Sequence, residues 1–226
     1  MMNSESELQP AIIDLREVSY RYAQGAGIFE LSLRVEKGEL VIMEGPTGAG
    51  KTTLVRVLTG ELPLQAGWGQ VAEISLRDLK GGTLSQLRGR LGLIFQEEHF
   101  LESESVLANA AAPLAIDGKP RSEQKAQALK MLVEVGLAPM ARKKPSQLSG
   151  GEKARLQIAR ALIREPQLLI ADEPFAHLDN LSAAEVAELI LRAHRRGTTV
   201  LVMTNRQDVS PPEARRFFLE KGRLRE

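Results

Sequence analysis

The spacing of apolar residues along the chain predicts an α/β fold. Residues 12–22 are rich in β-forming side chains, and residues 31–35 alternate between apolar and polar, as a strand with one buried face does. Residues 40–43 form a continuous apolar run of strand length, which is typical of a strand buried on both faces of a parallel sheet. Further strands are predicted at residues 91–95, 168–171, 199–203 and 217–219.

The pattern changes between residues 103 and 164, where the sequence is alanine-rich and its apolar residues follow helical spacing. Helices are predicted at residues 52–58, 126–133 and 154–162, and from a capping box of Ser182 and Glu185 onward. The pattern contains no internal repeat and no low-complexity tract. The prediction is therefore a mixed sheet with crossover helices and an inserted helical portion.

Composition excludes several classes of protein. The 226 residues are 43% hydrophobic, enough for a substantial core, and they include no cysteine, which excludes a disulfide framework and a cysteine nucleophile. The net charge of +1 gives no electrostatic reason to expect a nucleic-acid partner. The longest uncharged apolar stretch, residues 106–116, is shorter than the ~20 residues of a membrane-spanning helix. Residues 1–7 are polar and acidic, unlike a secretory signal, so we expect an intracellular globular protein.

One segment predicts a phosphate-binding loop. Residues 45–52, Gly-Pro-Thr-Gly-Ala-Gly-Lys-Thr, match the pattern G-x-x-x-x-G-K-[ST] and lie between a buried strand and a helix. Glycines let consecutive main-chain N–H groups surround an anion at the helix N-terminus. Lys51 can reach the β- and γ-phosphates, and the Thr52 hydroxyl can bind Mg²⁺. The alternative, a plain glycine-rich turn, fits these flanking elements poorly, so we expect a nucleoside triphosphate to bind here.

A second group of residues narrows the choice among nucleotide-binding proteins. The segment Leu148-Ser149-Gly150-Gly151-Glu152 precedes a predicted helix, and the apolar strand that follows ends in Asp172-Glu173. An apolar strand ending in Asp-Glu is the Walker B arrangement. We expect Asp172 to hold Mg²⁺ through water and Glu173 to orient and polarise the attacking water. Taken alone, the two acids would fit a solvated strand end better.

With these motifs in place, the chain resembles the ATP-binding subunit of ABC (ATP-binding cassette) transporters. The resemblance covers residues 18–223, and residues 148–152 match the family's signature sequence. It implies a P-loop NTPase cassette in a single domain, 1–226. The cassette would have a mixed-sheet RecA-like core at about 11–100 and 166–226, an N-terminal antiparallel β portion, and a helical subdomain at about 101–165. Residues 94–101 and 109–114 look most like the cell-division subunit, with the lipoprotein-release and macrolide-export ATPases as close relatives.

The resemblance also implies further site residues. Gln96 falls at the family's Q-loop, Asp179 at its D-loop, and Tyr22 at the aromatic residue that stacks on adenine. Tyr22 could instead be a packed strand aromatic, and Gln96 a solvated loop residue. The predicted nucleotide contacts are Tyr22, Gly45, Pro46, Thr47, Gly48, Ala49, Gly50, Lys51, Thr52, Thr53, Ser149, Gly150, Gly151, Glu152 and Asp179. The predicted catalytic residues are Lys51, Gln96, Glu173 and Asn205, and the predicted Mg²⁺ ligands are Thr52, Gln96 and Asp172.

The mechanism that the resemblance implies needs two copies of the chain. Each ATP would lie between the phosphate loop of one subunit and the signature of the other. Ser149 and Glu152 have capping-box spacing, so the signature is expected to open a helix whose N-terminus points at the γ-phosphate. The nucleotide would then hold the homodimer together until hydrolysis.

One departure from the family bears on the predicted chemistry. Asn205 follows the strand at 199–203 where the family usually has a histidine. An amide can donate a hydrogen bond to the γ-phosphate, but it cannot carry the positive charge that roughly doubles the strength of such a bond. We therefore expect slow turnover with ATP binding largely intact.

The resemblance further implies a partner. An integral membrane, permease-like subunit is expected to contact the chain near His99, Phe100 and Leu101, which would place the chain in the cytoplasm at the inner face of the membrane. Core packing of these three residues is the alternative. Asn205 also leaves open a regulatory module that dimerises with ATP and hydrolyses little. A soluble ABC ATPase acting on DNA or ribosomes fits poorly, since the chain has neither a second cassette nor a basic surface.

Overall fold

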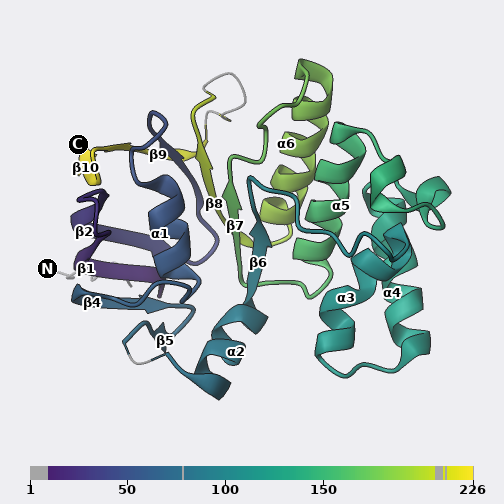
Figure 1. Cartoon of the computed structure of the whole chain (residues 1–226), viewed down its shortest axis with the longest axis horizontal. Helices are drawn as coiled ribbons and strands as arrows, with labels where there is room; N and C mark the ends of the chain where they lie inside the picture. Colours follow the sequence, from purple (N-terminus) through teal and green to yellow (C-terminus); the bar gives the residue numbers. More distant parts are fainter. Residues whose placement is uncertain (1–9, 78, 207–210, 212, 226) are drawn as a thin grey trace, which may run out of the picture.

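Two β-sheets and a group of helices make up the molecule (Figure 1). The structure, a computed structural model, describes residues 10–77, 79–206, 211 and 213–225; the polar N-terminal residues 1–7 lie outside this part. The strands are β1 (Ala11–Arg21), β2 (Gly27–Glu36), β3 (Leu40–Glu44), β4 (Ala66–Val71), β5 (Ile74–Ser75), β6 (Leu91–Ile94), β7 (Leu168–Asp172), β8 (Thr199–Thr204), β9 (Arg215–Glu220) and β10 (Arg223–Arg225). The helices are α1 (Lys51–Leu58), α2 (Gly81–Arg90), α3 (Val106–Ile116), α4 (Arg121–Glu134), α5 (Gly150–Leu162) and α6 (Asn180–Arg195), with short 3₁₀ turns η1 (Ala138–Met140) and η2 (Pro145–Gln147).

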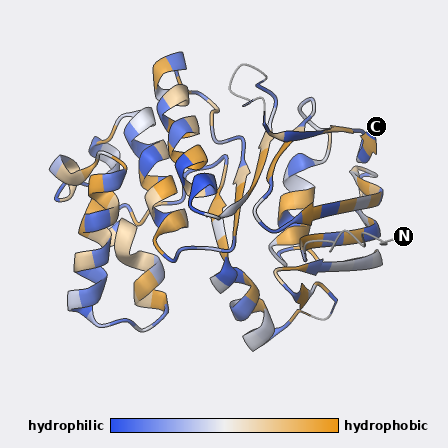
Figure 2. Cartoon of the chain, turned by 180° about the vertical axis from the view of Figure 1, so that it is seen from behind, coloured by the Kyte–Doolittle hydropathy of each residue, from blue (hydrophilic) through white to orange (hydrophobic). Residues whose placement is uncertain are grey.

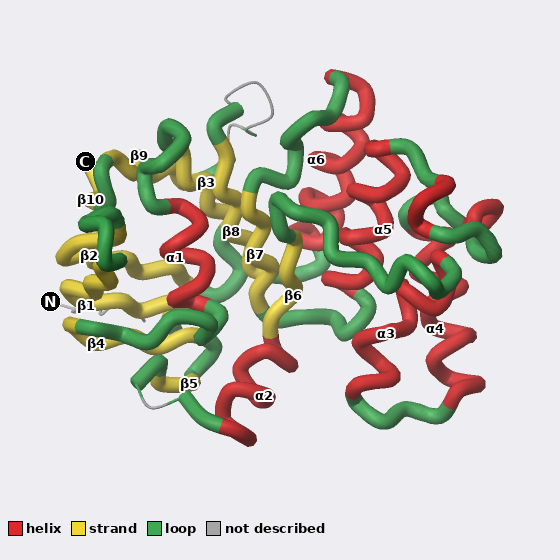
Figure 3. Tube along the Cα trace, in the orientation of Figure 1, coloured by secondary structure: helices red, strands yellow, loops and turns green. Residues whose placement is uncertain are grey.

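The central sheet is mixed, as the sequence predicted. Within the described residues its strand order is β10-β9-β3-β8-β7-β6, and all neighbours are parallel except β10 against β9. The second sheet, in the order β2-β1-β4-β5, is antiparallel throughout and lies at the opposite end of the molecule from α3 and α4 (Figure 3). Because the parallel strands share one direction, their carboxyl ends and the loops that follow lie at one edge of the sheet.

The apolar runs of the central strands are explained by burial on both faces. In β7, Leu169 and Ala171 belong to the core cluster that includes α5 and α6, whereas Leu168 and Ile170 belong to the cluster that includes α1 and the antiparallel sheet. Successive side chains of a strand point to opposite faces, so each strand contributes to both clusters. Figure 2 shows these strands as mainly hydrophobic, with mixed colouring on the outer helices. Burying each large apolar side chain contributes about 1.5–3 kcal/mol.

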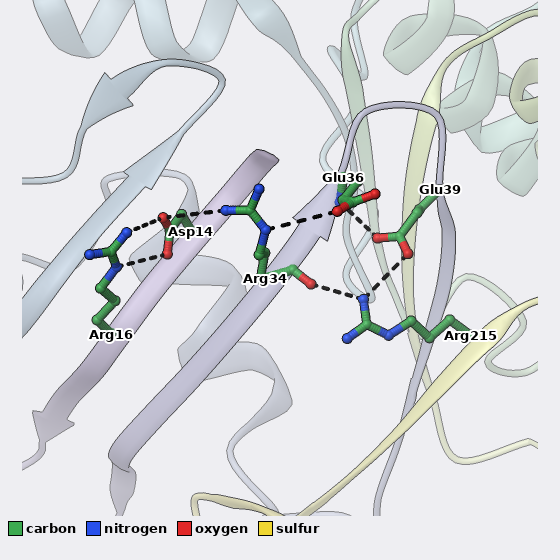
Figure 4. Close-up of polar contacts among 6 residues, drawn as sticks. All are labelled: Asp14, Arg16, Arg34, Glu36, Glu39 and Arg215. Atoms are coloured by element: carbon green, nitrogen blue, oxygen red, sulfur yellow. Dashed lines mark hydrogen bonds and ion pairs between the residues drawn. The ribbon is translucent and has the colours of Figure 1, made fainter. Parts of the chain in front are cut away.

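A polar chain crosses the outer face of the antiparallel sheet and reaches the central sheet (Figure 4). Asp14 pairs with Arg16 at 2.9 Å and with Arg34 at 3.8 Å across β1 and β2. Arg215 of β9 donates to the Arg34 carbonyl at 3.1 Å and pairs with Glu39 at 3.3 Å. Exposed pairs contribute little individually. Their consequence here is that β2 and β9, which belong to different sheets, are tied together.

Buried Asn109 fixes the loop that leads into α3. Its Oδ1 accepts from the main-chain N–H of Leu101 at 2.8 Å, and its Nδ2 donates to the Leu101 and Ser105 carbonyls, each at 3.0 Å. A buried amide with these partners satisfies main-chain groups that would otherwise lack them.

In the described residues, no helix combines the length and the apolar character that crossing a bilayer requires.

One predicted helix start is wrong. The capping box expected from Ser182 and Glu185 does not open α6, because the helix begins at Asn180 with Asp179 as its N-cap. Asp179 and Ser182 are both residue types that favour the N-cap position, and the Asp179 carboxylate accepts from the Ser182 N–H at 2.9 Å. Glu185 instead pairs with Arg155 of α5.

Candidate functional site

The phosphate loop joins the carboxyl end of β3 to α1, as predicted. Gly45 passes so close to β9 that an added Cβ would lie 2.3 Å from the Leu219 carbonyl oxygen. Gly50, the N-cap of α1, has φ 110°, a conformation that L side chains rarely adopt. No side chain caps α1, and its first turn contains no acidic residue. The first N–H groups of the helix are therefore available to an anion.

Lys51 is held at the base of this loop. Its side chain is only 6% exposed, and Nζ donates to the Gly45 carbonyl at 2.6 Å and the Pro46 carbonyl at 3.3 Å. Nζ also lies 3.0 Å from Oε1 of Glu173, the residue that follows β7. The loop thus places a buried cation beside the carboxylate predicted to activate water.

Asp172 is buried and carries an oxygen that needs a partner. The residue is 2% exposed, and burial raises the pKa of its carboxyl, while a hydrogen bond with the Thr52 hydroxyl acts to lower it. Among the described residues, no hydrogen-bond partner reaches Oδ1. A divalent cation between Asp172 and Thr52 would satisfy that oxygen. No group of three or more His, Cys, Asp or Glu side chains in the described part forms a metal cage, so phosphate and water oxygens would complete the ligand set.

Glu173 is held by main-chain contacts with β8 and with Asn205, the residue at the position where the family usually has a histidine. Its backbone has φ 50°, and its N–H donates to the Met203 carbonyl of β8 at 2.8 Å. Its Oε2 accepts from the main-chain N–H of Asn205 at 3.1 Å. Asn205 therefore contacts the carboxylate through its backbone rather than through its amide side chain.

Lys51, Glu173 and Asn205 line one cavity of about 460 Å³, whereas the predicted site residues Gly45, Pro46 and Asp172 are not among its lining residues. Its walls are residues 26–27, the phosphate loop and first turn of α1 (47–53), Gln96, Glu173, residues 175–178, and Asn205 with Arg206. The cavity thus brings together Lys51, Gln96, Glu173 and Asn205, the four predicted catalytic residues. A larger cavity of about 870 Å³ lies at the amino ends of β6, β7 and β8, next to α4, and none of the predicted site residues lines it. The smaller cavity carries the phosphate-binding chemistry.

The signature segment forms the predicted helix start, and its residues are not among those lining this cavity. Ser149 is the N-cap of α5: its Oγ accepts from the Glu152 N–H at 3.3 Å, and Glu152 Oε2 accepts from the Ser149 N–H at 2.7 Å. The bond from the Ser149 N–H holds the pKa of Glu152 below its ordinary value. Ser149 and Gly150 are exposed, and no residue of the segment 149–152 is among those lining the cavity.

Tyr22 and Asp179 also lie outside the cavity lining. Tyr22 follows β1, packs edge-on against Tyr20 with ring centroids 5.0 Å apart, and hydrogen-bonds Arg56, whose pKa this contact raises. Its stacking on adenine stays a prediction. Asp179 caps α6, and its two bonds with the Ser182 N–H and hydroxyl hold its pKa low.

Sequence reasoning missed two sets of residues near the site. Arg206 lines the cavity directly after Asn205. On α5, three side chains at helical spacing hold the segment that follows β6: Lys153 pairs with Glu98 at 2.9 Å, Gln157 accepts from the Phe95 N–H at 3.2 Å, and Arg160 donates to the His99 carbonyl. The spacing 153, 157 and 160 was the available signal, since these positions share a helix face.

Known proteins resemble the chain over nearly its whole length. A family model described as ABC transporter matches residues 28–176. The cell division ATP-binding protein FtsE of Streptococcus pneumoniae (serotype 2, strain D39) is 36% identical over 216 residues, which cover 95% of this chain and 94% of that protein. The lipoprotein-releasing system ATP-binding protein LolD of Alcanivorax borkumensis is 34% identical over 220 residues, covering 95% and 96%.

A solved structure shares the fold. The dimeric, post-hydrolysis structure of the ATP-binding cassette MJ0796, bound to ADP and Pi, superimposes with a TM-score of 0.87 at 28% identity. The match covers 95% of this chain and 97% of that one.

Proposed function

The chain belongs to the ABC transporter ATP-binding family, and we propose that it acts as one of two identical subunits that drive or gate a separate membrane subunit. The family resemblance and the cassette fold predicted from the sequence are confirmed, and the chain is an ATPase. Within the family we propose the cell-division type, on the strength of the match to FtsE over 216 residues.

One observation carries the two-subunit proposal: a single chain carries both predicted halves of an ATP site, but only one of them lines the cavity. The cavity contains the phosphate loop and the water-activating carboxylate, whereas the exposed N-terminus of α5 lies outside it. A second copy could place its Ser149 segment over the cavity and close the nucleotide in. The MJ0796 cassette, which shares this fold, was solved as a dimer with ADP and Pi.

The roles of the cavity residues follow from their contacts. The β- and γ-phosphates would draw Lys51 from Glu173 and from the loop carbonyls, because phosphate oxygens carry more charge than carbonyl oxygens. Glu173, released from the ion pair and still held by the Asn205 N–H, would then accept a proton from the attacking water. Thr52 and Asp172, with Gln96, would hold Mg²⁺, which when bound neutralises phosphate charge.

Slow turnover remains part of the proposal. The main-chain bond from residue 205 to Glu173 does not depend on the side chain, so the replacement of histidine by Asn205 leaves it in place. What the amide lacks is a positive charge toward the γ-phosphate. A charge-assisted bond exceeds a neutral one by roughly 1 kcal/mol, so Asn205→His should raise kcat about fivefold at a pH where the imidazole is protonated. An unchanged kcat would remove this part of the proposal.

We propose the loop 97–101 as the contact for the membrane subunit. Leu101 is 49% exposed, and Phe100 is partly buried beneath the guanidinium of Arg160, 5.7 Å from its ring centroid. Because Arg160 lies on α5, a push on this loop would pass to the helix that begins at Ser149. The membrane contact and the signature would move together.

The decisive experiment measures the mass of the Glu173→Gln protein in solution with Mg²⁺ and ATP. The variant keeps the cavity but removes the proton acceptor, so we expect a stable dimer with ATP and a monomer without it. Glu173→Gln combined with Lys51→Ala is the matched control and should stay monomeric. If the Glu173→Gln protein stays monomeric in ATP, with or without its membrane subunit, the two-subunit proposal is wrong. Wild-type hydrolysis no faster than that of Glu173→Gln would favour the regulatory module.

A further inference from the structure

Arg206 connects two loops at the cavity that are far apart in sequence. Its Nη1 donates to the Leu178 carbonyl at 3.2 Å, and its Nη2 donates to Oδ1 of Asn180 at 3.0 Å. Leu178 is the next-to-last residue of the β7–α6 loop (residues 173–179), and Asn180 is the first residue of α6. One guanidinium thus holds both sides of Asp179, the helix cap.

The arginine itself is anchored to the central sheet. Its N–H donates at 3.0 Å to the hydroxyl of Thr204, a fully buried residue at the end of β8. The residue between them, Asn205, holds Glu173 through its own N–H. The two donor atoms of a guanidinium are fixed in one plane, so Arg206 sets the distance between the β8 end and the β7–α6 loop more tightly than a lysine could.

The held loop continues to the signature helix of the same chain. Asp179 bonds the Ser182 hydroxyl at 2.8 Å, and Ser182 packs against Gly151 so closely that a Cβ at Gly151 would lie 2.7 Å from its Oγ. A continuous set of contacts therefore runs from the phosphate-facing residue 205, through Arg206 and Asp179, to the start of α5.

We propose that Arg206 is a positioning residue that aligns the β7–α6 loop and the start of α5 with the catalytic Glu173 of its own chain. The proposal rests on the two-subunit function, because the start of α5 serves the nucleotide of the second copy. In this proposal Arg206 does not bind the phosphates. It holds the signature segment of a subunit in a fixed position relative to the catalytic residues of the same subunit.

The test compares hydrolysis by Arg206→Ala, Asn180→Ala and the double variant, with Arg195→Ala as control. Arg195 is an exposed arginine of α6 that pairs with Glu188 at 3.3 Å and lies outside the cavity. We expect kcat to fall about tenfold in Arg206→Ala and about threefold in Asn180→Ala, with KM for ATP within twofold of wild type. Since both contacts act through one bridge, the double variant should be no slower than Arg206→Ala. Arg195→Ala should match wild type.

Two results would overturn the proposal: an unchanged kcat in Arg206→Ala, or a double variant whose loss equals the product of the single losses. If Arg206→Ala does not fold, Arg206→Lys keeps the charge but loses the fork. It should show a kcat about threefold to fivefold low with unchanged KM, and wild-type activity in it would also overturn the proposal. ATP-dependent dimer formation by Glu173→Gln alone is scored separately. A monomer there contradicts the two-subunit function, whereas a dimer with a fully active Arg206→Ala contradicts only the role of Arg206.

Discussion

Helices α1 and α5 both have glycine at their N-termini, but the main-chain N–H groups at the two N-termini are treated in opposite ways. At α1 no side chain caps the helix, the N-cap Gly50 is in a left-handed conformation, and a buried lysine adds positive charge. At α5 the N-terminus is already satisfied, since Ser149 and Glu152 each accept the other's N–H. Glu152 also places a negative charge there, held ionised by that contact.

The difference indicates which helix provides affinity. The start of α1 has unpaired donors and a cation, so it gains much from an anion. The start of α5 is stable without one and offers only its remaining N–H groups. We infer that a single chain binds ATP through α1, and that α5 contributes when a second chain brings its nucleotide.

Lys51→Ala should have the largest effect on ATP binding, and it changes the phosphate site at α1 while leaving the start of α5 unchanged. Loss of a charge-assisted contact to phosphate costs about 3 kcal/mol, so ATP affinity should fall about 100-fold and hydrolysis should be lost. Equilibrium binding of a fluorescent ATP analogue measures this. Lys37→Ala, which breaks an exposed pair with Glu73, is the control and should bind normally. A loss under tenfold in Lys51→Ala would mean that the helix N-terminus alone holds the phosphates.

Ser149→Ala is the corresponding change at α5. We expect the rate of hydrolysis to fall about tenfold, while the ATP affinity of the monomeric variant stays equal to that of the wild type. The lost cap also costs about 1 kcal/mol of stability. Ser105→Ala is a matched control, because Ser105 caps α3 in the same way, accepting from the Ala108 N–H at 3.1 Å. It should lose similar stability and keep full hydrolysis; an equal loss of activity in both would make the effect one of folding.

Asp172→Asn tests how much the buried carboxylate at the end of β7, next to the start of α1, lowers the stability of the folded protein. Burial raises the pKa of Asp172, so its ionised form destabilises the folded chain, and stability falls as pH rises through that pKa. The amide should stabilise the nucleotide-free protein by about 1 kcal/mol at pH 7.5, a Tm rise of roughly 2–4 °C for a chain of this size. Thermal unfolding at pH 7.5 and 4.5 measures this, and the advantage should shrink at the lower pH. A lower Tm in Asp172→Asn at pH 7.5 would contradict this assignment.

Glu152→Gln should have the smallest effect. Glutamine keeps an oxygen for the Ser149 N–H but removes the negative charge beside the N-terminus of α5. In the Glu173→Gln background we expect dimers to form at a twofold to threefold lower ATP concentration, because the charge would face a phosphate. Analytical ultracentrifugation over a range of ATP concentrations measures this. A need for more ATP would show that the charge helps the interface.

Features written in consecutive residues could be predicted from the sequence. The phosphate loop, the Asp172-Glu173 strand end and the Ser149 cap each depend on one short segment with its own local rule. Helix α2 was missed, because it begins Gly-Gly-Thr and buries only Leu87, so it has almost no apolar period. Strand β4 was missed for a similar reason, with glycine at two of its six positions.

Contacts between distant segments could not be predicted. Arg206 meets residues 26 and 28 positions away, and only the parallel pairing of β7 with β8 brings these loops together. The prediction of the α6 cap failed for another reason: Asp179 and Ser182 are both favoured N-cap residues, and only the structure distinguishes them. At the predicted membrane contact, Leu101 is 49% exposed and Phe100 is partly packed against the helices, and the contact itself stays a prediction.

Because the bond to Glu173 comes from the main-chain N–H of residue 205, the position of the carboxylate does not depend on the side chain at 205. Every amino acid except proline has that N–H, so a substitution at 205 leaves the main-chain bond to the carboxylate in place. Under the proposed function, position 205 is thus a site where one substitution would change the rate of hydrolysis without moving Glu173.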